Sequence, residues 1–264
     1  MTARTLGVIL CDLDSYAVDD LDCVEAGAPA ISANPVGFFE NPASWPGIPV
    51  SYAVARGARV ERLVAGDPVA IDAFWRARER LAHCSLIITD CGFFYYARQS
   101  DLPTANTLTS SLDLLPLAAT LTRARIGVLT VSAPLASRML AADPLYPRLT
   151  IVGLEDQPGW SGILTDDHAY GNGWDLGTLR AGVEAVLERE CAPGGRLADV
   201  GALVLECTLL PEFRRDIAQY TSVPILDVAS FALSALGPGF DSGAGFDSGA
   251  GYDDGTGQVA RPRR

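Results

Sequence analysis

Two cysteines occupy matching positions in the two halves of the chain, and both are well placed for chemistry. Cys91 follows the apolar stretch Leu86–Thr89, and Cys207 follows Leu203–Glu206. Both stretches predict buried strands, and a small residue and a helix-like pattern come after each cysteine. Ligands of open α/β sheets bind at the carboxyl ends of the strands. We therefore predict that two thiols face one substrate across a cleft.

A thiol between a strand and the start of a helix has a lowered pKa, because the helix N-terminus favours the thiolate. A thiolate and an opposing thiol form an acid/base pair. The first removes a proton from a carbon next to a carboxylate, and the second returns one to the opposite face. Backbone N–H groups and hydroxyls must then stabilise the enediolate. By position, the candidate hydroxyls are those of Ser110, Ser111, Thr130, Ser132 and Thr208.

The composition of the 264 residues excludes several other kinds of chemistry. All 20 basic residues are arginine, so a Schiff-base lysine and a P-loop lysine are absent. Histidine occurs only at His83 and His168, which leaves little material for histidine triads or metal sites. The net charge of −12 argues against general nucleic-acid binding, and no apolar run approaches the ~18 residues of a membrane span. We expect no nucleic acid and no membrane contact.

The remaining cysteines indicate a reduced, cytoplasmic protein rather than a disulfide framework. None of the six forms a Cys-x-x-Cys pair, and the short apolar N-terminus followed by aspartates is unlike a secretory signal. Cys11, Cys23, Cys84 and Cys191 are interpreted as core residues. Asp166, Asp167 and His168 are adjacent and are interpreted as a solvated loop, since neighbouring residues rarely reach one ion.

Strands and helices alternate along the chain, which predicts an α/β protein with parallel sheets. Asp67 and Asp175 predict the starts of two helices as N-caps. Residues 28–49 are rich in proline and glycine and predict a long irregular segment of the kind that often carries function. Strands are predicted at residues 6–11, 49–54, 86–90, 125–131, 149–153, 203–206 and 223–226.

Four motifs resemble those of the aspartate/glutamate racemase superfamily, which also contains hydantoin racemases, maleate isomerases and arylmalonate decarboxylases. The resemblance covers roughly residues 6–236. Its motifs are Asn41-Pro42-Ala43-Ser44-Trp45-Pro46, Thr89-Asp90-Cys91-Gly92-Phe93, Thr109-Ser110-Ser111-Leu112 and Leu205-Glu206-Cys207-Thr208. It implies two similar Rossmann-like lobes with parallel sheets, an active site in the cleft between them, Cys91 and Cys207 as the catalytic pair, and no cofactor.

The resemblance also implies lobe boundaries and further contacts. Residues 1–110 and 225–236 would form one lobe, 111–224 the other, and 237–264 a disordered tail built on a glycine-rich hexad. Asn41, Gly92 and Phe93 would bind the substrate, a small carboxylate, and a homodimer is expected by analogy.

Three functions remain open at this point. The first is a cofactor-independent racemase or epimerase that uses both cysteines. The second is a maleate-isomerase-like or decarboxylase-like enzyme in which one cysteine attacks or protonates the substrate. The third is a catalytically silent binding protein. Glutamate racemases have Asn-Thr where this chain has Gly92-Phe93, and His or Glu where it has Leu209. The apolar replacements favour a more apolar or non-amino-acid substrate.

Overall fold

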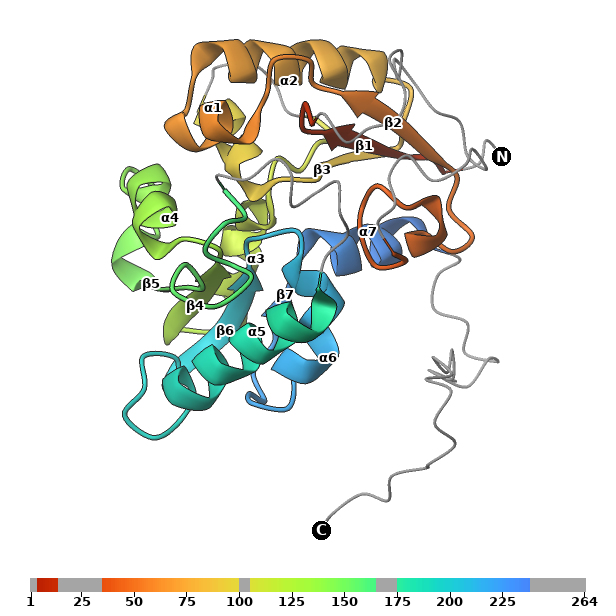
Figure 1. The fold of residues 1–264 in the computed structure, drawn as a ribbon. Coiled ribbons are helices and arrows are strands. Elements are labelled where there is room, and N and C mark those ends of the chain that lie inside the picture. The colour runs from red at the N-terminus through yellow and green to blue at the C-terminus, as the bar shows by residue number, and fades with distance from the viewer. Residues whose placement is uncertain (1–3, 14–34, 100–104, 165–174, 238–264) are drawn as a thin grey trace.

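The computed structural model describes residues 4–13, 35–99, 105–164 and 175–237, which form two parallel sheets (Figure 1). The first sheet has the strand order β2-β1-β3 and the second β5-β4-β6-β7. The strands are β1 (Leu6–Leu10), β2 (Val50–Val54), β3 (Leu86–Thr89), β4 (Arg125–Thr130), β5 (Leu149–Gly153), β6 (Val200–Leu205) and β7 (Ile225–Leu226). The predicted α/β class with parallel sheets is confirmed.

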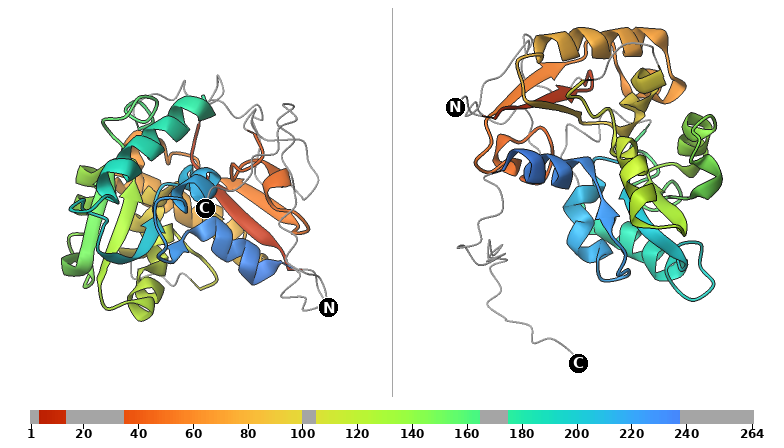
Figure 2. Two further views of the ribbon diagram at one scale, coloured as in Figure 1. Left: turned by 90° about the horizontal axis from the view of Figure 1, so that it is seen from below. Right: turned by 180° about the vertical axis from the view of Figure 1, so that it is seen from behind.

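Helices cover both sheets, which explains why the central strands are apolar on both faces. Every residue of β1 and β2 is buried, as expected for parallel strands packed between helices. The α-helices are α1 (Val60–Ala65), α2 (Pro68–Arg80), α3 (Leu115–Leu121), α4 (Ala133–Leu140), α5 (Leu176–Glu190), α6 (Arg214–Ile217) and α7 (Val228–Leu236). Figures 1 and 2 together place α5 on one face of the second sheet and α3 on the other.

Short 3-10 helices connect several strands to the elements that follow. They are η1 (Pro42–Ser44), η2 (Gly92–Gln99), η3 (Ser111–Leu114), η4 (Tyr146–Arg148) and η6 (Leu210–Phe213). Cys91 directly precedes η2, and Cys207 lies just before η6. The expected order of strand, cysteine and helical turn is therefore found at both cysteines.

The predicted N-caps are confirmed, because each aspartate accepts backbone hydrogen bonds at the start of its helix. Asp67 accepts from the N–H of Val69 at 2.8 Å, with Pro68 in the first turn of α2. Asp175 accepts from the N–H groups of Gly177 and Thr178 at the start of α5.

The C-terminal segment of the described chain is shared between the two sheets. β7 pairs with β6 and so belongs to the second sheet, which differs from the lobe boundary expected at residue 225. α7 instead contacts β3 of the first sheet, and its first N–H, from Val228, donates to Ser111 Oγ at 3.0 Å. A short strand completes the edge of one sheet, while the helix after it covers the other.

Some predicted features lie outside the described residues: Cys23, the sequence Asp166-Asp167-His168, residues 28–34 of the irregular segment, and the tail beyond residue 237. Within the described ranges, no helix has the length and apolarity needed to cross a membrane.

Candidate active site

One pocket lies where the carboxyl ends of strands from both sheets meet. Cys11 follows β1, Cys91 follows β3, Val131 follows β4 and Cys207 follows β6, and all four line the pocket. It holds about 580 Å³ of space between atoms, its open mouth included. The other lining residues are Leu13, Phe38, Phe39, Glu40, Val60, Asp90, Gly92, Phe93, Ile163, Leu164, Glu206, Thr208 and Leu209.

Cys91 is fixed by the backbone and side chain of the residue before it. The Asp90 N–H donates to the Ile9 carbonyl at 3.0 Å, and both carboxylate oxygens of Asp90 lie 3.0 Å from the Cys11 N–H. The Thr89 hydroxyl lies 3.1 Å from the Cys91 carbonyl oxygen. These bonds hold the half-buried Cys91 just after the end of β3 and next to the end of β1.

Cys207 is fixed by the second sheet and by a hydrogen bond to the first lobe. The Glu206 N–H donates to the Leu129 carbonyl at 2.8 Å, and the Leu210 N–H donates to the Cys207 carbonyl at 3.0 Å. The Thr208 hydroxyl donates to the Asp90 carbonyl. Thr208, which follows Cys207, therefore contacts Asp90, which precedes Cys91, across the boundary between the sheets.

The Cys207 thiol is held in its neutral form, contrary to the expected thiolate. Burial raises its pKa well above the ordinary value, and the charges of Glu206 and Cys91 raise it further. Backbone hydrogen bonds from Leu209 and Leu210 lower the Cys207 pKa but do not offset the burial. The N–H groups of the helical turn do lower the pKa of Cys207 as predicted, but the loss of water around the sulfur raises that pKa by more. Cys207 is therefore suited to donate a proton.

Cys11 is a third thiol of the pocket and was assigned only to the core by sequence reasoning. Its pKa is raised well above the ordinary value by burial, then by a hydrogen bond with Cys91 and by the charge of Asp90. The signal that could have found it is the one used for Cys91, since Cys11 also follows a buried apolar strand directly.

Glu206 enters the pocket beside Cys207 and is fully buried. Its Oε2 accepts a hydrogen bond from the Thr130 hydroxyl at 2.7 Å, whereas its Oε1 has no hydrogen-bond partner among the described residues. A Cβ on Gly92 would lie 1.9 Å from that Oε1, so only glycine fits between Cys91 and this carboxyl group.

The segment Phe38–Glu40 forms an aromatic and acidic wall that sequence reasoning also missed, apart from its position in a long irregular stretch. The carbonyl of Phe39 accepts from the Trp45 indole and the Tyr52 hydroxyl, both at 3.1 Å. The Ser44 hydroxyl donates to the Phe38 carbonyl at 2.6 Å. These bonds hold an irregular backbone firmly enough to shape the pocket.

The ionisable side chains of the pocket are all acids, and no arginine or histidine lines it among the described residues. The acids are Cys11, Glu40, Asp90, Cys91, Glu206 and Cys207. An anionic substrate group would therefore have to be held by hydrogen-bond donors rather than by a positive side chain. In the described part of the chain, no group of three or more His, Cys, Asp or Glu residues is arranged to hold a metal ion.

The eight expected substrate-binding residues divide into three groups. Gly92, Phe93 and Thr208 line the pocket. Thr130 does not line it but holds Glu206. Asn41, Ser110 and Ser132 are N-caps of η1, η3 and α4, and Ser111 accepts from the first N–H of α7. These four stabilise helix ends and are not part of the pocket wall.

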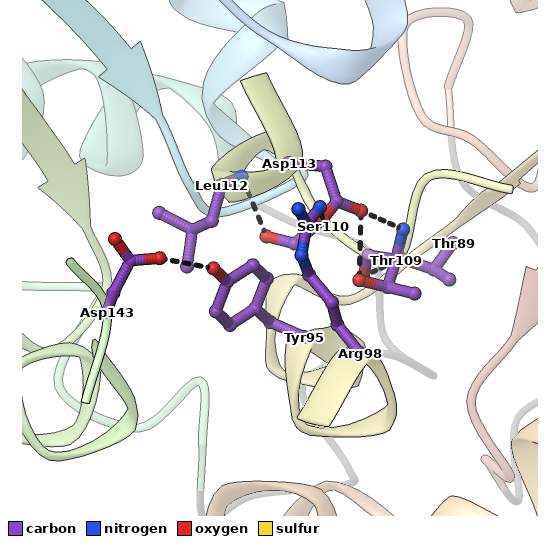
Figure 3. A network of polar contacts seen from close by, with 8 residues as sticks. All are labelled: Thr89, Tyr95, Arg98, Thr109, Ser110, Leu112, Asp113 and Asp143. Atoms are coloured by element: carbon purple, nitrogen blue, oxygen red, sulfur yellow. Dashed lines mark hydrogen bonds and ion pairs between the residues drawn. The ribbon is translucent and has the colours of Figure 1, made fainter. Parts of the chain in front are cut away.

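A polar network on the far side of η2 ties this helix to the second lobe (Figure 3). The Tyr95 hydroxyl donates to Asp143 at 2.8 Å, and Arg98 forms an ion pair with Asp113. Asp113 also accepts from the N–H of Thr109 at 2.6 Å. Because η2 begins right after Cys91, this network fixes the helix whose N-terminus faces the pocket.

Comparison with known proteins finds similarity to a curated relative and to solved structures. A dimethylsulfoniopropionate lyase from Durusdinium sp. clade D is 28% identical over 158 residues, covering 54% of this chain and 48% of that protein. The chain thus spans about half the length of the curated relative it matches. Allantoin racemase from Klebsiella pneumoniae superposes with a TM-score of 0.43 at 14% identity, covering 89% of each chain. No protein-family model matches. The chain is therefore similar to a lyase over part of its sequence.

Proposed function

We propose that this protein is a cofactor-independent enzyme of the aspartate/glutamate racemase superfamily, an isomerase of the racemase or epimerase type that moves a proton at a carbon next to a carboxylate. The observation that carries the proposal is that Cys91 and Cys207 line one pocket, each just after the carboxyl end of a parallel strand, one from each sheet. Paired acid and base groups on two sides of a cleft are what proton exchange at one carbon requires.

The two sulfurs have different starting roles in this mechanism. Cys91 takes the proton as a thiolate, and the electron pair of the broken C–H bond moves into the substrate carboxylate to form an enediolate. Cys207, held neutral by burial, gives its S–H proton to the opposite face of the carbon and becomes the thiolate. The first N–H groups of η2 have no partner within that helix and are suited to stabilise the negative charge.

The substrate that fits this pocket is a small carboxylate with an apolar or aromatic substituent. Phe38, Phe39 and Phe93 supply ring surfaces, and Leu209 supplies an aliphatic one. The described pocket wall offers no basic side chain for a second anionic group. A carboxylate on the substituent, as in aspartate or glutamate, is therefore disfavoured.

A test of this proposal follows proton exchange in deuterated water. The full chain is incubated with single enantiomers of apolar 2-substituted carboxylates, and the loss of the Cα–H signal is followed by proton NMR beside chiral chromatography. Cys91→Ser and Cys207→Ser should each reduce racemisation by about 10²–10⁴-fold. Cys191→Ser is the matched control, because Cys191 caps α5 away from the pocket. Full racemisation by Cys91→Ser would refute the two-thiol mechanism.

A second candidate is an enzyme of the same fold in which one cysteine attacks or protonates the substrate: a lyase, a decarboxylase or a maleate-isomerase-like enzyme. The protonation state of Cys207 favours it, because a one-way reaction needs a fixed acid and not two sulfurs that exchange roles. The curated relative is named as a lyase. In a decarboxylation, the C–C bond to the leaving carboxylate breaks, CO₂ departs, and Cys207 protonates the remaining carbanion.

Substituted malonates separate these candidates from each other and from a silent binding protein. Release of CO₂ with one deuterated enantiomer as product would support the decarboxylase and count against racemisation. Binding of carboxylates without exchange, elimination or CO₂ release across the whole panel would overturn both enzymatic proposals.

A further inference from the structure

Glu206 has a free buried oxygen that neither cysteine role explains. The residue is fully buried, and its Oε1 has no hydrogen-bond partner within the described part of the chain. Buried polar atoms almost always have a partner, so an exception needs a reason. Because Glu206 also lines the pocket, a bound ligand is the natural partner for this oxygen.

Neighbouring residues determine which of the two carboxyl oxygens is available. Thr130 donates its hydroxyl proton to Oε2 at 2.7 Å, so a proton carried by the carboxyl group belongs on Oε1. Oε1 packs directly against Gly92, since a Cβ there would lie 1.9 Å away. The oxygen without a partner therefore lies next to the start of η2, which begins at Gly92.

The surroundings favour the protonated form of this carboxyl group near neutral pH. Burial raises the pKa of Glu206 to about 7, against a smaller lowering by the Thr130 hydroxyl. The other ionisable groups that share its pocket are Cys11, Glu40, Asp90, Cys91 and Cys207. All of them are acids, and a negative charge on any of them would disfavour a carboxylate at Glu206.

We propose that Glu206 is a catalytic residue of this pocket, which donates a hydrogen bond from Oε1 to a carboxylate oxygen of the substrate. This oxygen gains charge as the enediolate forms, so the bond is stronger in the transition state than in the bound substrate. A neutral carboxylic acid supplies a donor without adding negative charge. The proton stays on Glu206 throughout, so no bond to it is made or broken.

This inference rests on the proposed function, because it assigns Glu206 to the same proton-transfer site. It also accounts for how a pocket with only acidic ionisable side chains in its described wall binds an anion. The prediction is that anion binding and turnover both require Glu206 to be protonated, and so both weaken as pH rises above about 7.

Glu206→Gln is the informative variant, because its amide has the shape of the carboxyl group and donates a hydrogen bond at every pH. We expect the ratio of the wild-type rate to the Glu206→Gln rate to fall towards tenfold per pH unit above pH 7, because the base Cys91 is common to both proteins and cancels in this ratio. Glu206→Ala, which has no donor, should lose about 10²–10³-fold at pH 6. Glu212→Gln is the control, since Glu212 is a partly buried acid whose pKa burial also raises, and it does not line the pocket.

Binding of benzoate tests the same residue without turnover. Calorimetry should give a Kd for wild type that rises about tenfold per pH unit above pH 7, and a Kd for Glu206→Gln that is constant from pH 6 to 8. If this holds while no carboxylate exchanges its proton, the proposed function fails and the role of Glu206 as donor stands. If exchange occurs but the ratio of the wild-type rate to the Glu206→Gln rate does not change between pH 6 and 8, the role of Glu206 is refuted and the function stands. Failure of benzoate to bind wild type at pH 6 would overturn the donor role as well.

Discussion

Replacing Gly92 with alanine tests the contact on which the geometry of the pocket depends. The new Cβ would lie 1.9 Å from Glu206 Oε1, 2.6 Å from its Cδ and 2.7 Å from its backbone oxygen. Carbon atoms do not approach this closely, so part of the structure must move. The Glu206 side chain is fully buried and held by Thr130, and its backbone oxygen belongs to the end of β6. The strain therefore has to separate η2 from β6.

The expected cost follows from the known penalty for adding a methyl group to a packed interior. We expect Gly92→Ala to lower the free energy of unfolding by about 1–3 kcal/mol, which at 2–4 °C per kcal/mol corresponds to a Tm lower by about 2–12 °C. Racemisation should fall further than stability, because the movement changes the separation of Cys91 from Cys207.

Urea unfolding of four variants, Gly92→Ala, Gly162→Ala, Glu206→Ala and the double variant Gly92→Ala with Glu206→Ala, measures this effect. Gly162→Ala is the matched control, because a Cβ there meets no atom within 4 Å; its stability should stay within about 0.5 kcal/mol of wild type. Combining Gly92→Ala with Glu206→Ala removes the side-chain part of the clash, so the double variant should be more stable than the sum of the two single effects predicts. Equal stability of Gly92→Ala and Gly162→Ala would refute the close approach of Glu206 to residue 92.

Two further predictions concern contacts away from the reacting groups. Tyr95→Phe removes the hydrogen bond to Asp143 and should lower the free energy of unfolding by about 1 kcal/mol, while Tyr146→Phe on the surface should not; equal urea midpoints for the two would contradict a structural role of this bond. Arg196, with a smaller contribution from Arg189, lowers the pKa of Glu190 to about 2, so these contacts stabilise the folded state above the ordinary pKa of about 4.3 and lose this effect as pH falls towards 2. Arg196→Gln should therefore cost about 2 kcal/mol at pH 7 and little at pH 2, and an unchanged difference between these pH values would refute the assignment.

The strands and helix starts could be predicted because they depend on residues that are close in sequence. β1, β3 and β6 are continuous apolar runs, and Asp67 and Asp175 cap helices within three residues of themselves. Order along the chain did not determine sheet membership. The pairing of β7 with β6 depends on which sheet edge is open, and this is a property of the assembled fold.

Hydroxyl groups near predicted helix starts were harder to assign to the site from sequence. Ser110 and Ser132 follow the N-cap pattern and are used as caps, while Thr208 has the same chemistry and lines the pocket. The difference lies in where each side chain points after the two sheets come together. Phe39 and Glu40 became pocket residues for the same reason, through hydrogen bonds from distant Trp45 and Tyr52 to a backbone without regular structure.

The sequence by itself determined the chemical resources of this protein: two thiols at strand ends, no lysine, few histidines and an alternation of strands and helices. Only the tertiary structure decided the protonation of Cys207 and which other groups share the pocket with the two thiols. Burial leaves Cys207 neutral where the helical turn alone would have favoured a thiolate, and it adds Cys11 and the free oxygen of Glu206 to the same pocket. The reason is that secondary structure follows from neighbours along the chain, whereas protonation follows from the water that distant segments exclude.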